Sequence, residues 1–131
     1  MIEKFGMGMN NYLSYHKELC DRARSLSKSK NADYSDPDAH LDDPMRVFRN
    51  FMLVEKLGVC SVEQGFLVRL CDKFSRLCNL LRKGHKRQVL DESKEDTILD
   101  IINYVILLAS YLKAVKDETK TSGDKIKWPR K

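Results

Sequence analysis

Apolar residues recur every three or four positions along most of this 131-residue chain, which is the period of amphipathic α-helices. We predict four helices, over residues 10–30, 45–58, 62–84 and 91–116. No segment shows the strict alternation of apolar and polar residues that is typical of β-strands. The sequence therefore predicts an all-α fold, a four- to five-helix bundle with two long central helices.

Capping and breaking residues mark several of the predicted helix ends. Asp43 followed by Pro44 predicts the start of the second helix, and Gly58 predicts its end. The S-x-x-Q pattern of residues 61–64 is a capping box, which predicts the start of the third helix. "NADYSDPDAHLDDP" (residues 31–44) is rich in Asp, Asn and Pro and predicts a loop. The second helix is expected to bury Val47, Phe48, Phe51 and Met52.

Length and charge give a simple domain plan. We expect one helical domain over residues 1–117, followed by a basic, flexible tail over 118–131 in which the helical period stops. The formal net charge is +5, of which the tail carries +3. This balance suits a phosphate ligand as well as a nucleic acid. The apolar run from Ile101 to Leu112 is too short to cross a membrane and no signal peptide is recognisable, so a cytoplasmic protein is expected.

The cysteines show no pattern of a metal or disulfide site. They lack C-x-x-C spacing and have no partnered histidines. We expect reduced thiols, most of them small residues of the helical core. The four cysteines are Cys20, Cys60, Cys71 and Cys78.

Polar residues near the start of the last helix form one narrow stripe. At about 100° per residue, Asn103, Asp96 and Asp100 fall near ~20°, ~40° and ~80° from Glu92. The rest of this helix is largely apolar, as in helices that lie in a core. Carboxylates in such a place are paired or bind a metal. Two interpretations stay open: a solvated face with acids near a helix start, or a face that binds a cation.

The third helix carries a second polar stripe. It lies opposite a stripe that is expected to be apolar core, made of Leu67, Leu70, Cys71, Phe74, Leu77, Cys78 and Leu81. The polar residues are Arg69, Asp72, Lys73, Arg76, Asn79 and Lys83. This stripe is either an ordinary solvated face or one that meets the stripe of the last helix through antiparallel packing.

If the two stripes meet, their residue types suit a metal-bound phosphate chain. The acids Asp72, Glu92, Asp96 and Asp100 would then converge on one or two magnesium ions, which take oxygen ligands. Basic residues would contact phosphate oxygens. A metal between carboxylates and phosphates can activate water for in-line attack. The expected phosphate contacts are Arg69, Lys73 and Arg76.

The loop "KNADYSDP" adds groups that suit a base or a sugar. Asn31, Asp33 and Tyr34 offer an amide, a carboxylate and a ring for stacking. The same residue types are also those that ordinary turns use, so a plain turn is the alternative.

Three segments in order resemble a known family: "KNADYSDP", "VRLCDKFSRLCNLLRKG" and "DESKEDTILDIINYVILL". They are similar to the phage-associated nucleotide modification associated domain 1 family, itself distantly similar to the all-α, MazG-like nucleoside triphosphate pyrophosphohydrolases. The resemblance covers roughly residues 28–110, and its most specific parts lie at 72–80 and 91–104. It implies a helical bundle, often a homodimer or higher oligomer, that acts on nucleotides with magnesium or manganese in a host cytoplasm.

By position, the resemblance also implies residue roles. Asp72, Glu92 and Asp96 would be catalytic and, with Asp100, would bind the metal. Phosphate contacts would be Lys73 and Arg76, nucleoside contacts Asn31, Asp33 and Tyr34, and a polar support Asn103. The chain departs from the MazG-like pattern in two places: it lacks the E-E-x-x-E run, and Thr97 stands where the Glu of E-x-x-D would precede Asp100.

Three functional hypotheses follow. The first is a magnesium-dependent pyrophosphohydrolase of a ribo- or deoxynucleoside triphosphate, linked to a phage nucleotide pool or to DNA modification. The second is a module of the same fold that binds a nucleotide or nucleotide-like signal without cleaving it. The third is a DNA-binding adaptor that uses the basic tail and the connector "RKGHKR", and whose affinity would fall steeply with salt.

Overall fold

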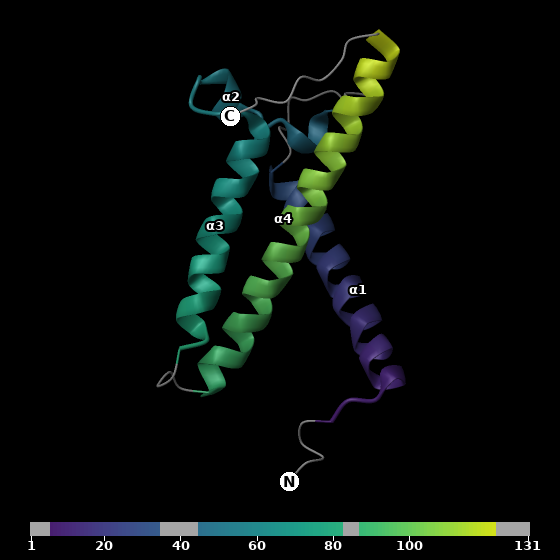
Figure 1. Ribbon diagram of the computed structural model, residues 1–131, viewed down its shortest axis with the longest axis vertical. Helices are drawn as coiled ribbons and strands as arrows, with labels where there is room; N and C mark the ends of the chain where they lie inside the picture. The colour runs from purple at the N-terminus through teal and green to yellow at the C-terminus, as the bar shows by residue number, and fades with distance from the viewer. Residues whose placement is uncertain (1–5, 35–44, 83–86, 123–131) are drawn as a thin grey trace.

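The structure is a computed structural model that describes residues 6–34, 45–82 and 87–122. Its elements are α1 (Met9–Tyr34), the 3-10 helix η2 (Arg46–Phe48), α2 (Leu53–Lys56), α3 (Val62–Leu80) and α4 (Arg87–Ser122). Within these ranges there is no β-strand, so the all-α prediction is confirmed. Figure 1 shows α4 in the middle, with α3 beside it on one side and α1 crossing it on the other.

The apolar core lies at one end of the pair formed by α3 and α4. Side chains from the η2 segment, from the start of α3 and from the later turns of α4 meet there. Phe51 stacks on Phe66 with 4.8 Å between ring centroids, and Phe48 meets the edge of Tyr111 at 5.6 Å. The buried residues of this core are Met45, Phe48, Phe51, Val62, Phe66 and Tyr111.

The start of α3 is fixed by the predicted capping box. Ser61 has an extended backbone, and its hydroxyl accepts a hydrogen bond from the Gln64 backbone N–H at 3.1 Å. In return, the Gln64 side-chain oxygen accepts one from the Ser61 backbone N–H at 3.1 Å. Two N–H groups that the first helical turn leaves without partners are satisfied in this way. The predicted start of the third helix is confirmed.

Two glycines shape the short α2 segment before this cap. Gly58 follows α2 with a φ of 74°, a backbone conformation that favours glycine. Gly65, in the first turns of α3, lets α2 approach closely, because a Cβ atom there would lie 2.9 Å from Val54 Cγ2. The predicted stop at Gly58 is confirmed.

The second predicted helix is not continuous. Residues 46–48 form η2, turns follow over 49–52, and only 53–56 are α-helical. Phe48 and Phe51 are buried as predicted and Met52 is partly buried, but Val47 is exposed. The prediction failed because the chain bends between η2 and α2, which ends the common helical face. Asp43 and Pro44 lie outside the described residues.

The long helices also differ from their predicted bounds. α1 extends to Tyr34, so the first four residues of the predicted loop are helical. α3 ends at Leu80, earlier than the predicted stop at Gly84. α4 begins at Arg87 and reaches Ser122, so the predicted tail starts inside a helix. These boundaries carry weak sequence signals, and helix ends are the least predictable part of a helix.

The cysteines are free, but they are not core residues. Cys20, Cys71 and Cys78 are exposed and Cys60 is partly buried, which contradicts the core prediction. The stretch Ser93–Lys116 of α4 is long and apolar enough to cross a membrane, judged by length and composition alone. The prediction from the shorter run Ile101–Leu112 was therefore wrong about length, although core helices of soluble proteins meet the same criterion.

Candidate functional site

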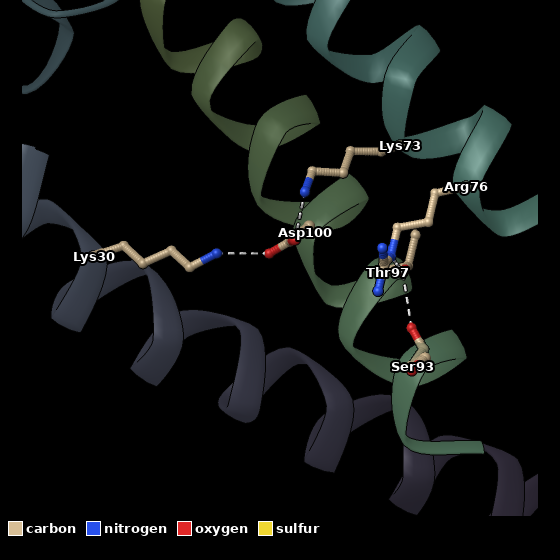
Figure 2. A network of polar contacts seen from close by, with 6 residues as sticks. All are labelled: Lys30, Lys73, Arg76, Ser93, Thr97 and Asp100. Carbon is tan, nitrogen blue, oxygen red and sulfur yellow. Dashed lines mark hydrogen bonds and ion pairs between the residues drawn. The ribbon is translucent and has the colours of Figure 1, made fainter. Parts of the chain in front are cut away.

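Three helices meet at the carboxylate of Asp100 on α4. Lys30 of α1 places its Nζ 2.8 Å from Oδ1, and Lys73 of α3 places its Nζ 3.0 Å from Oδ2. Figure 2 shows the two ammonium groups reaching this carboxylate from different directions, one from α1 and one from α3. We call this cluster the polar junction; it consists of Lys30, Lys73, Arg76, Ser93, Thr97 and Asp100.

The junction favours the ionised form of Asp100. Its side chain is 17% exposed, and this burial alone would raise the pKa of the carboxyl group. The hydrogen bonds and positive charges of Lys30 and Lys73 act in the opposite direction and outweigh burial, so the pKa of Asp100 lies below its ordinary value. Asp100 is therefore a charged anchor between α1 and α3 at neutral pH.

Thr97 forms the second part of the junction, one turn before Asp100. The Thr97 hydroxyl donates to the backbone carbonyl of Ser93 at 2.7 Å and accepts from Arg76 Nε at 3.3 Å. Only 2% of Thr97 is exposed. Thr97, the residue that departs from the E-x-x-D pattern, thus makes a buried contact between α3 and α4. A Glu side chain at this position would bury a charge in the interface between the two helices.

An open groove of about 770 Å³ runs between α1 and α4 beside the junction. This volume lies within the range of small-molecule sites, about 300–1,000 Å³. Asp96 of α4 is exposed and lines the groove one turn before Asp100. Ion pairs join Lys17 to Asp21 along α1 and Arg22 to Glu95 across to α4. The full lining is Ser14, Lys17, Glu18, Asp21, Arg22, Ser25, Leu26, Asp96 and Leu99.

A small cavity of about 30 Å³ lies on the other side of Asp100. Asn103 lines it, and the Asn103 Nδ2 atom is buried without a hydrogen-bond partner among the described residues. A space of this size holds one water molecule, which needs roughly 10–15 Å³. Asn103 and Asp100 line this cavity together, and the role of Asn103 as a polar support stays a prediction.

The remaining predicted residues are only partly brought together. Lys73 and Arg76 reach α4, whereas Asp72 is exposed on α3. Arg69 lies over the Phe51 ring, with 4.8 Å from its Cζ to the ring centroid. The side chains of Asn31, Asp33, Tyr34, Lys83 and Glu92 lie outside the described residues.

The expected convergence of acids is not found in the described part of the chain. No group of three or more His, Cys, Asp or Glu side chains is placed there to hold a metal ion. Asp100 is held by two lysines, Asp96 lies at the groove, and Asp72 is exposed on the other helix. The two polar stripes therefore contact each other at Lys73 and Asp100. Asp72 is exposed and takes no part in this contact.

Sequence reasoning missed Lys30 as a site residue. Lys30 is the last residue of the predicted helix over 10–30 and opens the segment "KNADYSDP", but no functional role was predicted for it. With α1 extended to Tyr34, Lys30 lies within the helix and one turn after Leu26, which lines the groove. The sequence signal that could have placed Lys30 on this face of the helix was its spacing of four residues from Leu26.

No protein-family model, curated protein or solved structure matches this chain. Function is therefore inferred from the polar junction and the groove beside it.

Proposed function

We propose that this chain binds the phosphate chain of a nucleoside triphosphate along α4, between Asp96 and the polar junction. The observation that carries this proposal is the meeting of Lys30 and Lys73 at Asp100, at 2.8 Å and 3.0 Å. Phosphate oxygens complement ammonium groups, and the junction brings two ammonium groups to one carboxylate. An ammonium group has three N–H donors, so Lys73 can contact Asp100 and a phosphate together.

Asp100 has a positioning role in this proposal. A lysine side chain is long and flexible, and holding it in one place costs conformational entropy. The Asp100 carboxylate holds Lys73 with one oxygen and Lys30 with the other, so both amines are in place before a ligand arrives. Such preorganisation lowers the cost of binding.

The activity proposed for this site is magnesium-dependent release of pyrophosphate. Asp96 is exposed at the groove, and Glu92 stands four residues before it in the sequence. These two acids would hold magnesium, or manganese in its place, together with phosphate oxygens. The bound metal would supply charge neutralisation and an activated water. Lys73 and Lys30 would hold the phosphate oxygens, while Asn31, Asp33 and Tyr34 stay the predicted nucleoside contacts.

The test is a panel of ribo- and deoxynucleoside triphosphates incubated with the protein and magnesium. We expect one of them to yield monophosphate and pyrophosphate, and we expect a chelator to stop the reaction. Asp96→Asn should abolish turnover with the helical circular dichroism signal unchanged. Loss of the folded state in that variant would instead make Asp96 a structural residue.

Binding is measured separately by calorimetry with a non-hydrolysable triphosphate. Lys73→Ala should weaken binding by about tenfold or more, since a hydrogen bond to a charged group contributes roughly 1.5–3 kcal/mol. Lys56→Ala removes a lysine from the exposed α2 segment and serves as the matched control, with binding unchanged. Equal binding by all three proteins would exclude the polar junction as the phosphate site.

A binding module without hydrolysis is the second candidate. It is favoured by the pairing of Asp100 with two lysines, because a carboxylate that neutralises amines is a weaker ligand for a cation. Saturable binding that depends on Lys73, with no product from any triphosphate in the panel, would select this candidate over the hydrolase.

A further inference from the structure

A second open groove lies between α1 and α4, with a volume of about 630 Å³. Among the described residues, five of α1 and three of α4 line it, and none of them lines the groove beside Asp96. Its volume lies within the range of small-molecule sites, about 300–1,000 Å³. This second groove is therefore a separate candidate site, and the inference drawn from it is independent of the proposed function.

The α1 wall of the second groove is basic. Arg24 and Lys28 both line it, and both side chains are exposed. They stand four residues apart, a spacing at which two like charges on a helix destabilise each other. No described residue that lines the groove is acidic. An anion bound at this wall would compensate both charges.

Other basic residues of α1 already have acidic partners. The pairs are Lys17 with Asp21, Arg22 with Glu95 and Lys30 with Asp100. Within residues 6–34, 45–82 and 87–122, Arg24 and Lys28 form no ion pair. These two cations therefore remain available to a ligand.

The α4 wall of the second groove is apolar. Ile102 and Ile106 line it one helical turn apart, and the buried Ala23 lines it from α1. Ile102 is partly buried, whereas Ile106 is 55% exposed. Covering such apolar surface removes it from water and is favourable. The groove thus has a basic wall on one helix and an apolar wall on the other.

One lining residue also offers a hydrogen-bond donor. Asn103 lines both the second groove and the small cavity beside Asp100. Its Nδ2 atom is buried and has no hydrogen-bond partner among the described residues. Buried polar groups in folded proteins nearly always have a partner. An acceptor oxygen, from a ligand or from a water in the small cavity, would satisfy this donor.

We propose that the second groove binds an unbranched aliphatic carboxylate. The carboxylate lies at Arg24 and Lys28, and the alkyl chain lies along Ile102 and Ile106. A guanidinium group can hold a carboxylate through two parallel hydrogen bonds, and an ammonium group adds a second positive charge. A small inorganic anion would leave the apolar wall uncovered, whereas a neutral hydrocarbon would leave both cations uncompensated.

The dimensions of the groove suit a chain of about eight carbons. Its lining on α1 extends from Cys20 to Lys28, about 12 Å of helix. At roughly 1.5 Å per carbon–carbon bond, an eight-carbon chain extends no more than about 11 Å. A helix of a partner protein normally places apolar anchors over two turns. The α4 wall offers one turn, from Ile102 to Ile106, so a small amphiphile fits better than a protein segment.

The first experiment is calorimetry of the full chain with octanoate, butanoate and 1-octanol. We expect octanoate to bind once per chain. Butanoate should bind at least tenfold more weakly, because each methylene removed from water contributes about fourfold to affinity. 1-Octanol should also bind at least tenfold more weakly, because it lacks the charge that the basic wall holds. Binding of either compound as tight as that of octanoate, or no binding of octanoate, would overturn the inference.

Two pairs of variants assign the binding to the two walls. Arg24→Gln should weaken octanoate binding at least tenfold, whereas Arg82→Gln, at an exposed arginine outside the groove, should leave it unchanged. Ile106→Ser should weaken it at least fivefold, whereas Val105→Ser, at the neighbouring exposed residue, should leave it unchanged. All four sites are exposed, so helical circular dichroism should be preserved. Equal binding by a variant and its control would place octanoate elsewhere and overturn the inference.

A cysteine of the groove provides a measurement on the unmodified chain. Cys20 is exposed and lines the second groove, whereas Cys71 is exposed on α3. Saturating octanoate should slow alkylation of Cys20 by a soluble maleimide at least threefold and leave the rate at Cys71 unchanged. Equal rates at Cys20 with and without octanoate would overturn the inference. Binding to phosphatidylglycerol vesicles without any binding of octanoate would overturn it as well, because it would assign the basic wall to an acidic membrane surface.

Discussion

The two ends of the α3–α4 pair are joined in different ways. At one end, the apolar core packs aromatic rings from η2, α3 and α4 with little exposed surface. At the other end, Lys73 reaches Asp100 and Arg76 reaches Thr97. The first contact is non-directional and gains from the area removed from water, whereas the second depends on charge and hydrogen-bond geometry. The core end can therefore supply most of the stability, and the junction end can hold groups in defined positions.

The largest expected effect is at the core end. Phe66→Ala removes a side chain that is 1% exposed and should lower the free energy of unfolding by about 3–5 kcal/mol. Urea denaturation followed by circular dichroism measures this change. Leu57→Ala removes an exposed apolar side chain and should change stability by less than about 0.5 kcal/mol. Similar losses in the two variants would mean that the apolar core does not dominate.

The next effect is at the polar junction. Asp100→Asn removes the charge that Lys30 and Lys73 share and should cost roughly 1.5–3 kcal/mol. Asp72→Asn on the exposed side of α3 should cost less than about 0.5 kcal/mol, and both variants are compared in urea. If Asp100→Asn is as mild as its control, the junction contributes no net stability and its charges matter only for ligands.

Lowering the pH should reduce the difference in the free energy of unfolding between the wild-type protein and Asp100→Asn. The folded-state pKa of Asp100 lies below its ordinary value, which is about 3.9 in an unfolded chain. The contribution of the ionised carboxylate is therefore complete above about pH 4 and is lost as the pH falls through the folded-state pKa. Urea denaturation of both proteins between pH 7 and pH 2 measures this difference in the free energy of unfolding. A difference in the free energy of unfolding that grows at low pH would contradict the lowered pKa of Asp100.

The smallest effect expected is at the cap of α3. Ser61→Ala removes the hydroxyl that accepts from Gln64 and should cost about 1 kcal/mol, within a range of roughly 0.5–2. The loss is read as a shift of the urea midpoint. Ser75→Ala on the exposed side of the same helix is the control and should be close to neutral. Equal shifts would show that the cap is not needed once the core holds the helix start.

Local patterns in the sequence predicted local structure well. The S-x-x-Q pattern gave the capping box at Ser61, and helical spacing gave the all-α class and the third helix. Spacing also placed Lys73 and Arg76 on one stripe, and both reach α4. These features depend on neighbours within one or two turns, which a sequence displays directly.

Contacts between helices were less predictable, because periodicity shows which residues share a stripe but not what each stripe touches. Phe74 belongs to an apolar stripe, yet α4 packs beside that stripe and leaves Phe74 exposed. Lys30 belongs to the junction through a partner 70 residues away. Thr97 was read as a missing acid, whereas its buried hydroxyl is a contact with Arg76. Each of these facts depends on how α1, α3 and α4 cross.

The arrangement of α1 against α4 has a consequence for the order of folding. α3 and α4 follow each other along the chain, so their pairing closes a short loop and can form early. Lys30 and Asp100 are 70 residues apart, and their contact must wait for a longer closure. Interactions made after the rate-limiting step mainly set how fast a protein unfolds. The link between Lys30 and Asp100 should therefore govern how long α1 stays docked, while the folding rate is set by the hairpin.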